Sequence, residues 1–100
     1  MKPSERHAWI LRYIAEVEPH GVDVLNSAFV DAYVEATGAN VRIMLWGANK
    51  CAQLGRDLTT MFHSRQLKRG RVGLGGNWQP GFPKWVWSYK PAVKNRDVVL

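Results

Sequence analysis

The stretch that decides the fold is Leu54-Gly-Arg-Asp-Leu58-Thr-Thr-Met61-Phe62-His-Ser-Arg-Gln-Leu67-Lys68-Arg69. The apolar pattern of this stretch begins three residues upstream, at Cys51. Counted from Cys51, the apolar residues fall at offsets of 0, 3, 7, 10 and 11, which form one stripe along a helix. These residues are Cys51, Leu54, Leu58, Met61 and Phe62. The pattern predicts a helix that Asn49 caps and that ends near residues 63–66, with this stripe against a core.

Two strand patterns follow the helix. Residues 67–74 form a basic segment with interspersed apolar residues, and in residues 84–89 Trp85, Trp87 and Tyr89 alternate with smaller residues. Such alternation is typical of strands. A stretch rich in Gly and Pro separates the two segments, so we expect a hairpin that ends at Pro91.

Two more helices are expected upstream. The spacing of apolar residues predicts one helix from a cap at Ser4 to Val17, before Pro19, and another from a cap at Asp23 to Gly38. Residues 40–46 alternate instead, which predicts a short strand or an extended link. We expect a single core made of Leu25, Phe29, Leu54, Leu58, Met61, Phe62, Leu67 and Val86.

The composition is that of one globular domain. With 100 residues, 46% of them hydrophobic and 22% charged, the chain can bury one core. We expect this domain to span residues 1–91, followed by a flexible tail over residues 92–100. No apolar run is long enough for a membrane span, and the first residues lack the apolar run of a secretory signal, so we expect a cytoplasmic protein. Its single cysteine, Cys51, agrees with a reducing compartment.

Charge is segregated along the chain. Residues 1–50 carry five basic and six acidic side chains, whereas residues 51–100 carry nine basic and two acidic ones. Between Arg65 and Lys90 there are six cations and no carboxylate. Such a segment attracts polyanions, and solubility would be served equally well by mixed charges. The distribution therefore favours a nucleic-acid partner.

The element order over residues 4–90 resembles that of a winged helix-turn-helix domain. The quoted stretch is similar to the recognition helix of such DNA-binding domains as it runs into the first strand of the wing. The resemblance implies an α+β fold with three helices, a short strand and a C-terminal β-hairpin wing. The link from Gly38 to Ala48 departs from the pattern, because it is long and carries its own strand signal. A free-standing domain of this size is similar to small transcriptional regulators of phages and mobile elements.

The resemblance implies double-stranded DNA as the partner, with the third helix in the major groove and the hairpin along the backbone. On the helix face opposite the apolar stripe, the candidates for base contacts are Gln53, Arg56, Thr60 and His63. Lys50 is better placed for a phosphate. The hairpin candidates are Arg65, Lys68, Arg69, Arg71 and Lys84 for phosphates, with Asn77, Trp78 and Gln79 at the tip for a groove.

Ordinary structural roles remain open for several of these residues. Any soluble helix has a polar face, Asp57 could pair with Arg56, and Trp78 could fold back onto its hairpin. We expect burial of Trp9, Trp46 and one of the two residues Trp85 and Trp87, and a partner surface at the remaining tryptophans.

Several functions are disfavoured. The glycines of residues 73–76 do not open a helix, as a phosphate-binding loop would. Cys51 and His63 are too far apart on one helix to act as nucleophile and base, and His7 and His20 lack carboxylates at metal-ligand spacing. We therefore expect no enzyme activity, no cofactor and no metal.

One alternative belongs to another class, because a fold does not fix a function. The same scaffold could serve a phage-encoded inhibitor, similar to anti-CRISPR proteins, that binds a host protein or nucleoprotein complex. The acidic residues of the first two helices would then contact the partner, and a homodimer also remains open. These residues are Glu16, Glu18, Asp23, Asp31 and Glu35.

Overall fold

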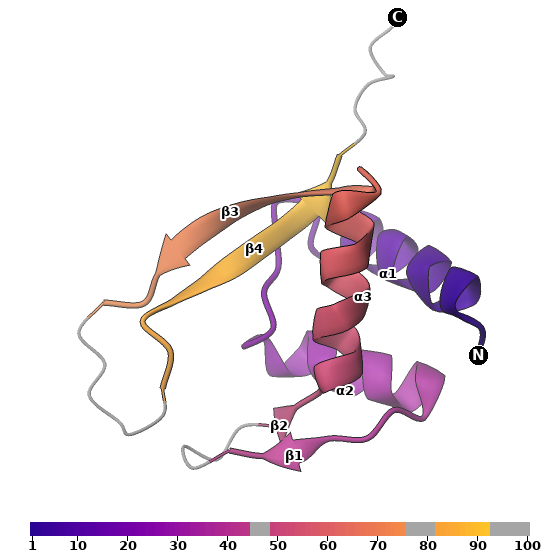
Figure 1. The fold of residues 1–100 in the computed structure, drawn as a ribbon, viewed down its shortest axis with the longest axis horizontal. Coiled ribbons are helices and arrows are strands. Elements are labelled where there is room, and N and C mark those ends of the chain that lie inside the picture. The colour runs from indigo at the N-terminus through magenta and orange to yellow at the C-terminus, as the bar shows by residue number, and fades with distance from the viewer. Residues whose placement is uncertain (45–48, 76–81, 93–100) are drawn as a thin grey trace, which may run out of the picture.

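A computed structural model of the chain describes residues 1–44, 49–75 and 82–92. This part of the chain forms an α+β fold of three helices and two antiparallel strand pairs (Figure 1). In chain order the elements are α1 (Pro3–Val17), α2 (Ser27–Thr37), β1 (Arg42–Ile43), β2 (Asn49–Lys50), α3 (Ala52–His63), β3 (Leu67–Gly73) and β4 (Trp85–Pro91). The predicted fold class is thus confirmed at the level of α+β.

The hairpin of β3 and β4 extends away from the helices (Figure 1). Its register runs from Leu67 opposite Pro91 to Gly73 opposite Trp85, and the hairpin expected from the two strand patterns is present. The link between α1 and α2 joins this hairpin through an antiparallel bridge between Val22 and Tyr89. Each of these two residues donates its N–H to the carbonyl of the other, at 2.9 and 2.8 Å. The bridge fixes the base of the hairpin beside the helices.

All three helices and the base of the hairpin contribute to one core. Its fully buried side chains are those of Ile10, Ile14, Phe29, Val30, Tyr33, Leu54, Leu58, Met61 and Leu67. The expected core is confirmed for Phe29, Leu54, Leu58, Met61 and Leu67, and Val86 is buried as well.

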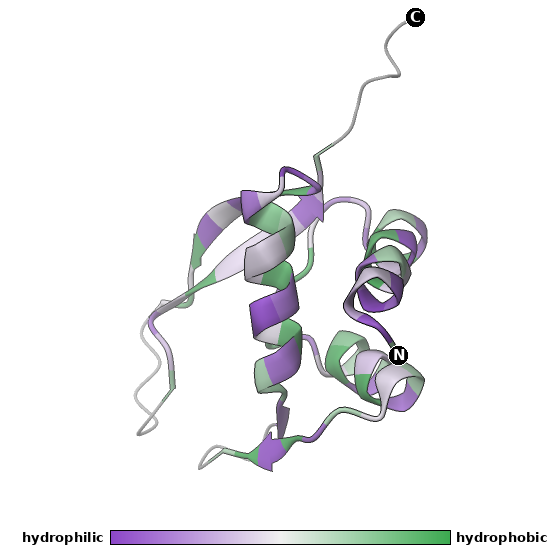
Figure 2. Ribbon diagram, turned by 45° about the vertical axis from the view of Figure 1, so that its right-hand side comes forward, coloured by the Kyte–Doolittle hydropathy of each residue, from purple (hydrophilic) through white to green (hydrophobic). Residues whose placement is uncertain are grey.

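Two members of the expected core are only partly buried. Leu25 precedes α2 rather than lying on it, and Phe62 packs at the edge of the core under the side chain of Arg69. α3 lies in front of the other helices in Figure 1, and Figure 2 shows that hydrophilic and hydrophobic residues both occur along it. One face of α3 thus packs inward, while the opposite face remains accessible.

The start of α1 differs from the sequence prediction. Lys2, not Ser4, is the residue before the helix, and Pro3 occupies the first helical position. Proline suits this position because its missing N–H would have no partner inside the helix. The side chain of Glu5 accepts a hydrogen bond from the Lys2 N–H at 2.8 Å, which satisfies a free donor at the helix start.

The starts of α2 and α3 also differ from the prediction. Asn26 caps α2, where its side chain accepts a hydrogen bond from the Phe29 N–H at 3.0 Å. Asp23 instead caps a turn upstream, by accepting from the Leu25 N–H at 2.8 Å. Cys51 precedes α3, because Asn49 belongs to β2. The predicted end of α2 at Gly38 is confirmed, and this glycine has a left-handed φ of 73°.

The strand expected over residues 40–46 is shorter than the pattern suggested. Among residues 40–44, the described part of this stretch, only Arg42–Ile43 forms a strand, and it pairs with β2 so that Arg42 lies opposite Lys50. Ile43 is 73% exposed, so the alternation does not mark a buried face. The predictions for Trp46, Asn77, Trp78, Gln79 and residues 93–100 concern positions outside the described residues. None of the described helices combines the length and apolar character that a membrane span requires.

Candidate nucleic-acid interface

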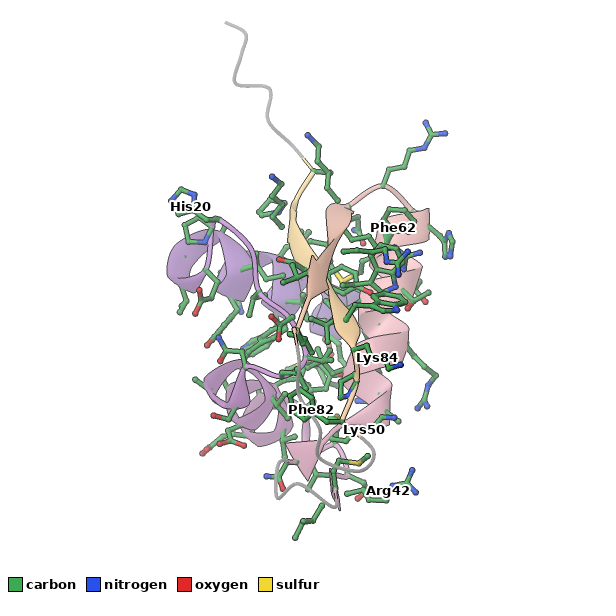
Figure 3. The ribbon with its side chains drawn as sticks, turned by 90° about the vertical axis from the view of Figure 1, so that its left-hand side faces the viewer. His20, Arg42, Lys50, Phe62, Phe82 and Lys84 are labelled. Atoms are coloured by element: carbon green, nitrogen blue, oxygen red, sulfur yellow. The ribbon has the colours of Figure 1, made fainter. Side chains whose placement is uncertain are left out.

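Positive charge gathers on the surface that α3 and the hairpin share. In Figure 3, Arg42, Lys50, Lys84 and Phe62 lie on the α3 and hairpin side of the molecule, whereas His20 lies on the opposite side. The acidic side chains of Glu16, Asp31 and Glu35 are exposed on α1 and α2. The exposed cations of α3, the hairpin and its flanks are Lys50, Arg56, Arg65, Lys68, Arg71, Lys84 and Lys90.

Three of the four residues predicted for base contacts lie on the exposed face of α3. Arg56, Thr60 and His63 are exposed, and their spacing aligns them along one side of the helix. Gln53 is different, because it is half-buried and its side-chain amide donates a hydrogen bond to the hydroxyl of Tyr33 at 3.0 Å. Its side chain therefore links α3 to α2 and does not lie on the open face with the other three residues.

Asp57 does not pair with Arg56, as the sequence had allowed. It is only 4% exposed, and Arg6 of α1 binds it through two hydrogen bonds of 2.8 and 3.0 Å. The hydroxyl of Tyr33 donates to the same carboxylate at 2.5 Å, and the Nε2 atom of His7 lies 3.3 Å from it. His7 thus has a carboxylate neighbour that sequence spacing did not reveal. Asp57 joins α1, α2 and α3 in one polar network.

The network shifts the pKa values of its members. Burial on its own raises the pKa of Asp57, but hydrogen bonds from Arg6 and Tyr33 and the charge of Arg6 lower it below its ordinary value. Burial first, and the hydrogen bond to Asp57 next, raise the pKa of Tyr33 to about 12. At neutral pH the carboxylate is therefore charged and the phenol protonated, which keeps every hydrogen bond of the network in place.

Aromatic rings hold the arginines of β3. The guanidinium carbon of Arg69 lies 3.9 Å from the ring centroid of Phe62 and 4.1 Å from that of Trp87, so both rings contact the group. Arg71 stacks on Trp85 at 4.3 Å. Cation–π contacts of this kind stabilise a side chain in one orientation. Arg69 is half-buried, whereas Arg71 remains exposed.

Trp85 and Trp87 are the rings on which the arginines of β3 stack, a role that the sequence analysis did not predict. Their ring centroids are 5.0 Å apart at an interplanar angle of 84°. Trp87 is half-buried against the core and Trp85 is 39% exposed, so neither is buried as fully as the sequence analysis expected for one of them. The hairpin register explains these contacts. Arg71 lies opposite Trp87, and cross-strand neighbours share a face, so the arginines of β3 and the tryptophans of β4 lie on the same side of the hairpin.

The turn after α3 carries a cation in an unusual backbone conformation. Arg65 has a φ of 67°, in the left-handed region where glycine is favoured. Its N–H donates to the Phe62 carbonyl at 3.0 Å, and the N–H of Gln66 donates to the Met61 carbonyl at 2.8 Å. These two bonds form a Schellman motif that closes the helix and leaves the Arg65 side chain exposed.

A groove of about 840 Å³ separates α3 from the hairpin. Lys50, Arg56 and Thr60 line one side of it, and Trp85 and Trp87 line the other. Most of its wall is apolar, so a partner that enters it must bring apolar or aromatic groups.

Neither metal-ligating side chains nor similarity to known proteins identifies the site. Among the described residues, no three His, Cys, Asp or Glu side chains lie close enough together to hold a metal ion. Cys51 is buried at the start of α3. Comparisons with protein-family models, with curated proteins and with solved structures found no match to this chain.

Proposed function

We propose that the chain is a DNA-binding protein of the winged helix-turn-helix type, without enzymatic activity, that acts as a small transcriptional regulator. The observation that carries this proposal is the separation of charge. In the described residues of α3, β3 and β4, the only carboxylate is Asp57, which is buried and paired with Arg6. The exposed surface of these three elements therefore carries cations and no carboxylate, a charge distribution that suits the phosphates of duplex DNA.

The topology supports the winged-helix assignment. Two helices precede α3, α3 runs directly into the hairpin, and the Val22–Tyr89 bridge keeps the hairpin beside the helices. An exposed helix with an adjacent hairpin fits duplex DNA, because a major groove about 12 Å wide admits one helix while the hairpin follows the backbone.

The roles of the residues follow from their exposure. Arg56, Thr60 and His63 on the open face of α3 are the candidates for base edges. Lys68, Lys84 and Lys50 are exposed near the edges of this surface, where phosphates would run, and they are joined by Arg71 on the hairpin face. Gln53 has no such role, because its amide is engaged inside the protein.

The experiment is a duplex titration at two salt concentrations with paired charge variants. The test variant changes Arg56, Lys68 and Lys84 to Glu, and all three residues are exposed. We expect this variant to lose duplex binding, because three cations become anions that phosphates repel. Any binding that remains should depend less on salt, since each lost phosphate contact reduces the magnitude of the slope of log K against log salt by about 0.9. The matched control changes exposed Asp31 and Glu35 of α2 to Ala and should bind at least as tightly as the parent. Equal affinity of the parent and the test variant would refute the proposal.

A protein-directed inhibitor is the second candidate, and the mostly apolar groove between α3 and the hairpin favours it. Such a partner would use charges of both signs, so the α2 control variant should lose activity in the cell. Loss of activity in that variant, with no duplex binding by the parent, would select the inhibitor over the regulator.

A further inference from the structure

A second and smaller cleft lies where α3 turns into β3. It has a volume of about 530 Å³, and its lining includes Phe62, His63, Arg65, Lys68 and Arg69. Four of these five side chains carry nitrogen donors, and no carboxylate is among the described residues that line it. The chemistry of the wall therefore suits an anion.

The guanidinium of Arg69 lies in this cleft without an ion-pair partner among the residues that the structure describes. The two ion pairs found among the described residues both involve Asp57, so Arg69 has no carboxylate partner there. Phe62 and Trp87 both stack against it, with ring centroids 3.9 and 4.1 Å from the guanidinium carbon, which restricts its orientation. Its Nε is buried and has no hydrogen-bond partner within the described part of the chain. The terminal nitrogens therefore form the edge that an external anion can reach.

The end of α3 does not oppose an anion here. The carbonyls at a helix C-terminus normally repel negative charge. In this turn, however, the carbonyls of residues 60–62 accept hydrogen bonds from the N–H groups of residues 64–66, at 2.8 to 3.0 Å. Arg65 adds a cation in the left-handed position that glycine would occupy with less strain.

We propose that this cleft binds a phosphate group, with Arg69 as its fixed ligand and with His63, Arg65 and Lys68 completing the site. A planar guanidinium held at one angle offers two parallel N–H donors to a phosphate, which a lysine cannot do. The site deepens the proposed function, on which it rests for the source of the phosphate. That source is either a phosphodiester within a DNA strand or the terminal phosphate of a DNA end, since both present the same oxygens.

The first test uses inorganic phosphate without DNA. The thermal midpoint is measured against phosphate concentration at constant ionic strength, for the parent and for Arg69→Gln. Phosphate also stabilises folded proteins non-specifically, so the difference between the two proteins is the readout. We expect a saturable rise in the parent that is absent in Arg69→Gln. Arg71→Gln is the matched control, because Arg71 also stacks on a ring of the hairpin but does not line the cleft, and it should retain the rise.

Conservative variants keep the test decisive. Arg69→Lys preserves the charge but loses the two parallel N–H donors of the guanidinium, so we expect at least tenfold weaker phosphate binding. Lys68→Gln alters an exposed residue, should fold normally and should weaken phosphate binding severalfold. If the parent, Arg69→Lys and Lys68→Gln respond equally to phosphate, the proposed site is wrong.

The second test distinguishes the two sources of phosphate. Duplexes with 5′-phosphate or 5′-hydroxyl ends are titrated with the parent and with Arg69→Lys. Equal binding of the two duplexes, equally weakened in the variant, identifies an internal phosphodiester. A preference for the phosphorylated end that the variant loses identifies a terminal phosphate. Duplex binding that neither free phosphate nor Arg69→Lys affects overturns the cleft while the proposed function stands. Phosphate binding through Arg69 without any duplex binding retains the cleft and overturns the proposed function.

Discussion

Replacing Asp57 with Asn should strongly destabilise the protein while leaving the size of the side chain unchanged. The carboxylate accepts two hydrogen bonds from Arg6 and one from Tyr33, at 2.5 to 3.0 Å, and it is 4% exposed. The amide of Asn has only one acceptor oxygen and no charge, so the half-buried guanidinium of Arg6 would lose its partner. Breaking a buried ion pair on one side costs about 3–5 kcal/mol. For a domain of this size each kcal/mol lowers the thermal midpoint by about 4–8 °C.

The same substitution should change how stability depends on pH. The pKa of Asp57 is lower in the folded protein than in the unfolded chain, so the unfolded chain binds more protons in acid. The stabilisation from Asp57 is therefore present above the unfolded value, about 4, and is lost as pH falls through the folded value. We expect Asp57→Asn to remove this component, so that its stability falls less steeply than that of the parent below about pH 4.

The assay is urea unfolding followed by tryptophan fluorescence, at pH 7 and at pH 3. Asp31→Asn is the matched control, because Asp31 is exposed on α2 and should change the free energy of unfolding by less than about 0.5 kcal/mol. A double-mutant cycle with Arg6→Gln measures the coupling between the two partners. If Asp57→Asn lowers the free energy of unfolding by less than about 1 kcal/mol, or if the coupling energy between Arg6 and Asp57 is near zero, the reasoning that Asp57 joins the three helices is refuted.

Four further substitutions have definite expected outcomes. Leu58→Ala removes a fully buried side chain of α3 and should cost about 2–5 kcal/mol in urea unfolding; an unchanged midpoint would mean that the inward face of α3 is wrongly assigned. Arg65→Gly relieves a left-handed φ of 67° and should stabilise the protein by about 0.5–1 kcal/mol, while weakening duplex binding. Arg71→Ala should weaken all duplex sequences alike and lower the salt slope by about one, whereas Arg56→Ala should cost about 1–3 kcal/mol at a preferred site only; equal losses on random DNA would make Arg56 a phosphate contact.

The periodic parts of the sequence predicted most of the fold. The apolar stripe of α3, the end of α2 at Gly38 and the hairpin from Leu67 to Pro91 agree with the structure. These features follow from local rules, since a helix stripe and a strand alternation are visible within a few turns of sequence. The cap predictions failed because several polar residues precede each helix, and Asn26 and Asp23 could cap equally well until the preceding turn was known.

The candidate site depended more on distant contacts. Asp57 pairs with Arg6, 51 residues earlier in the chain, and Gln53 binds Tyr33, 20 residues earlier. No periodicity within one element can reveal such pairs, so Gln53 was assigned to the solvent face by its helical angle alone. The stacking of Arg69 on Phe62 and Trp87 likewise requires three elements to meet, although the cross-strand register brings Trp87 near it.

The phase of α3 links the stability of the fold to the charge of its surface. Arg56 and Asp57 are consecutive, and a helix turns by about 100° per residue, so the two side chains point to different faces. Asp57 turns inward to Arg6, and Arg56 is therefore left exposed and without this carboxylate. Had the two paired with each other, the outer face of α3 would be neutral and Arg6 would lack its partner. The rotational orientation of α3 thus brings Asp57 to Arg6 and keeps the outer face of the helix positive. A substitution that rotates α3 about its axis should therefore lower the stability of the protein and its affinity for duplex DNA together.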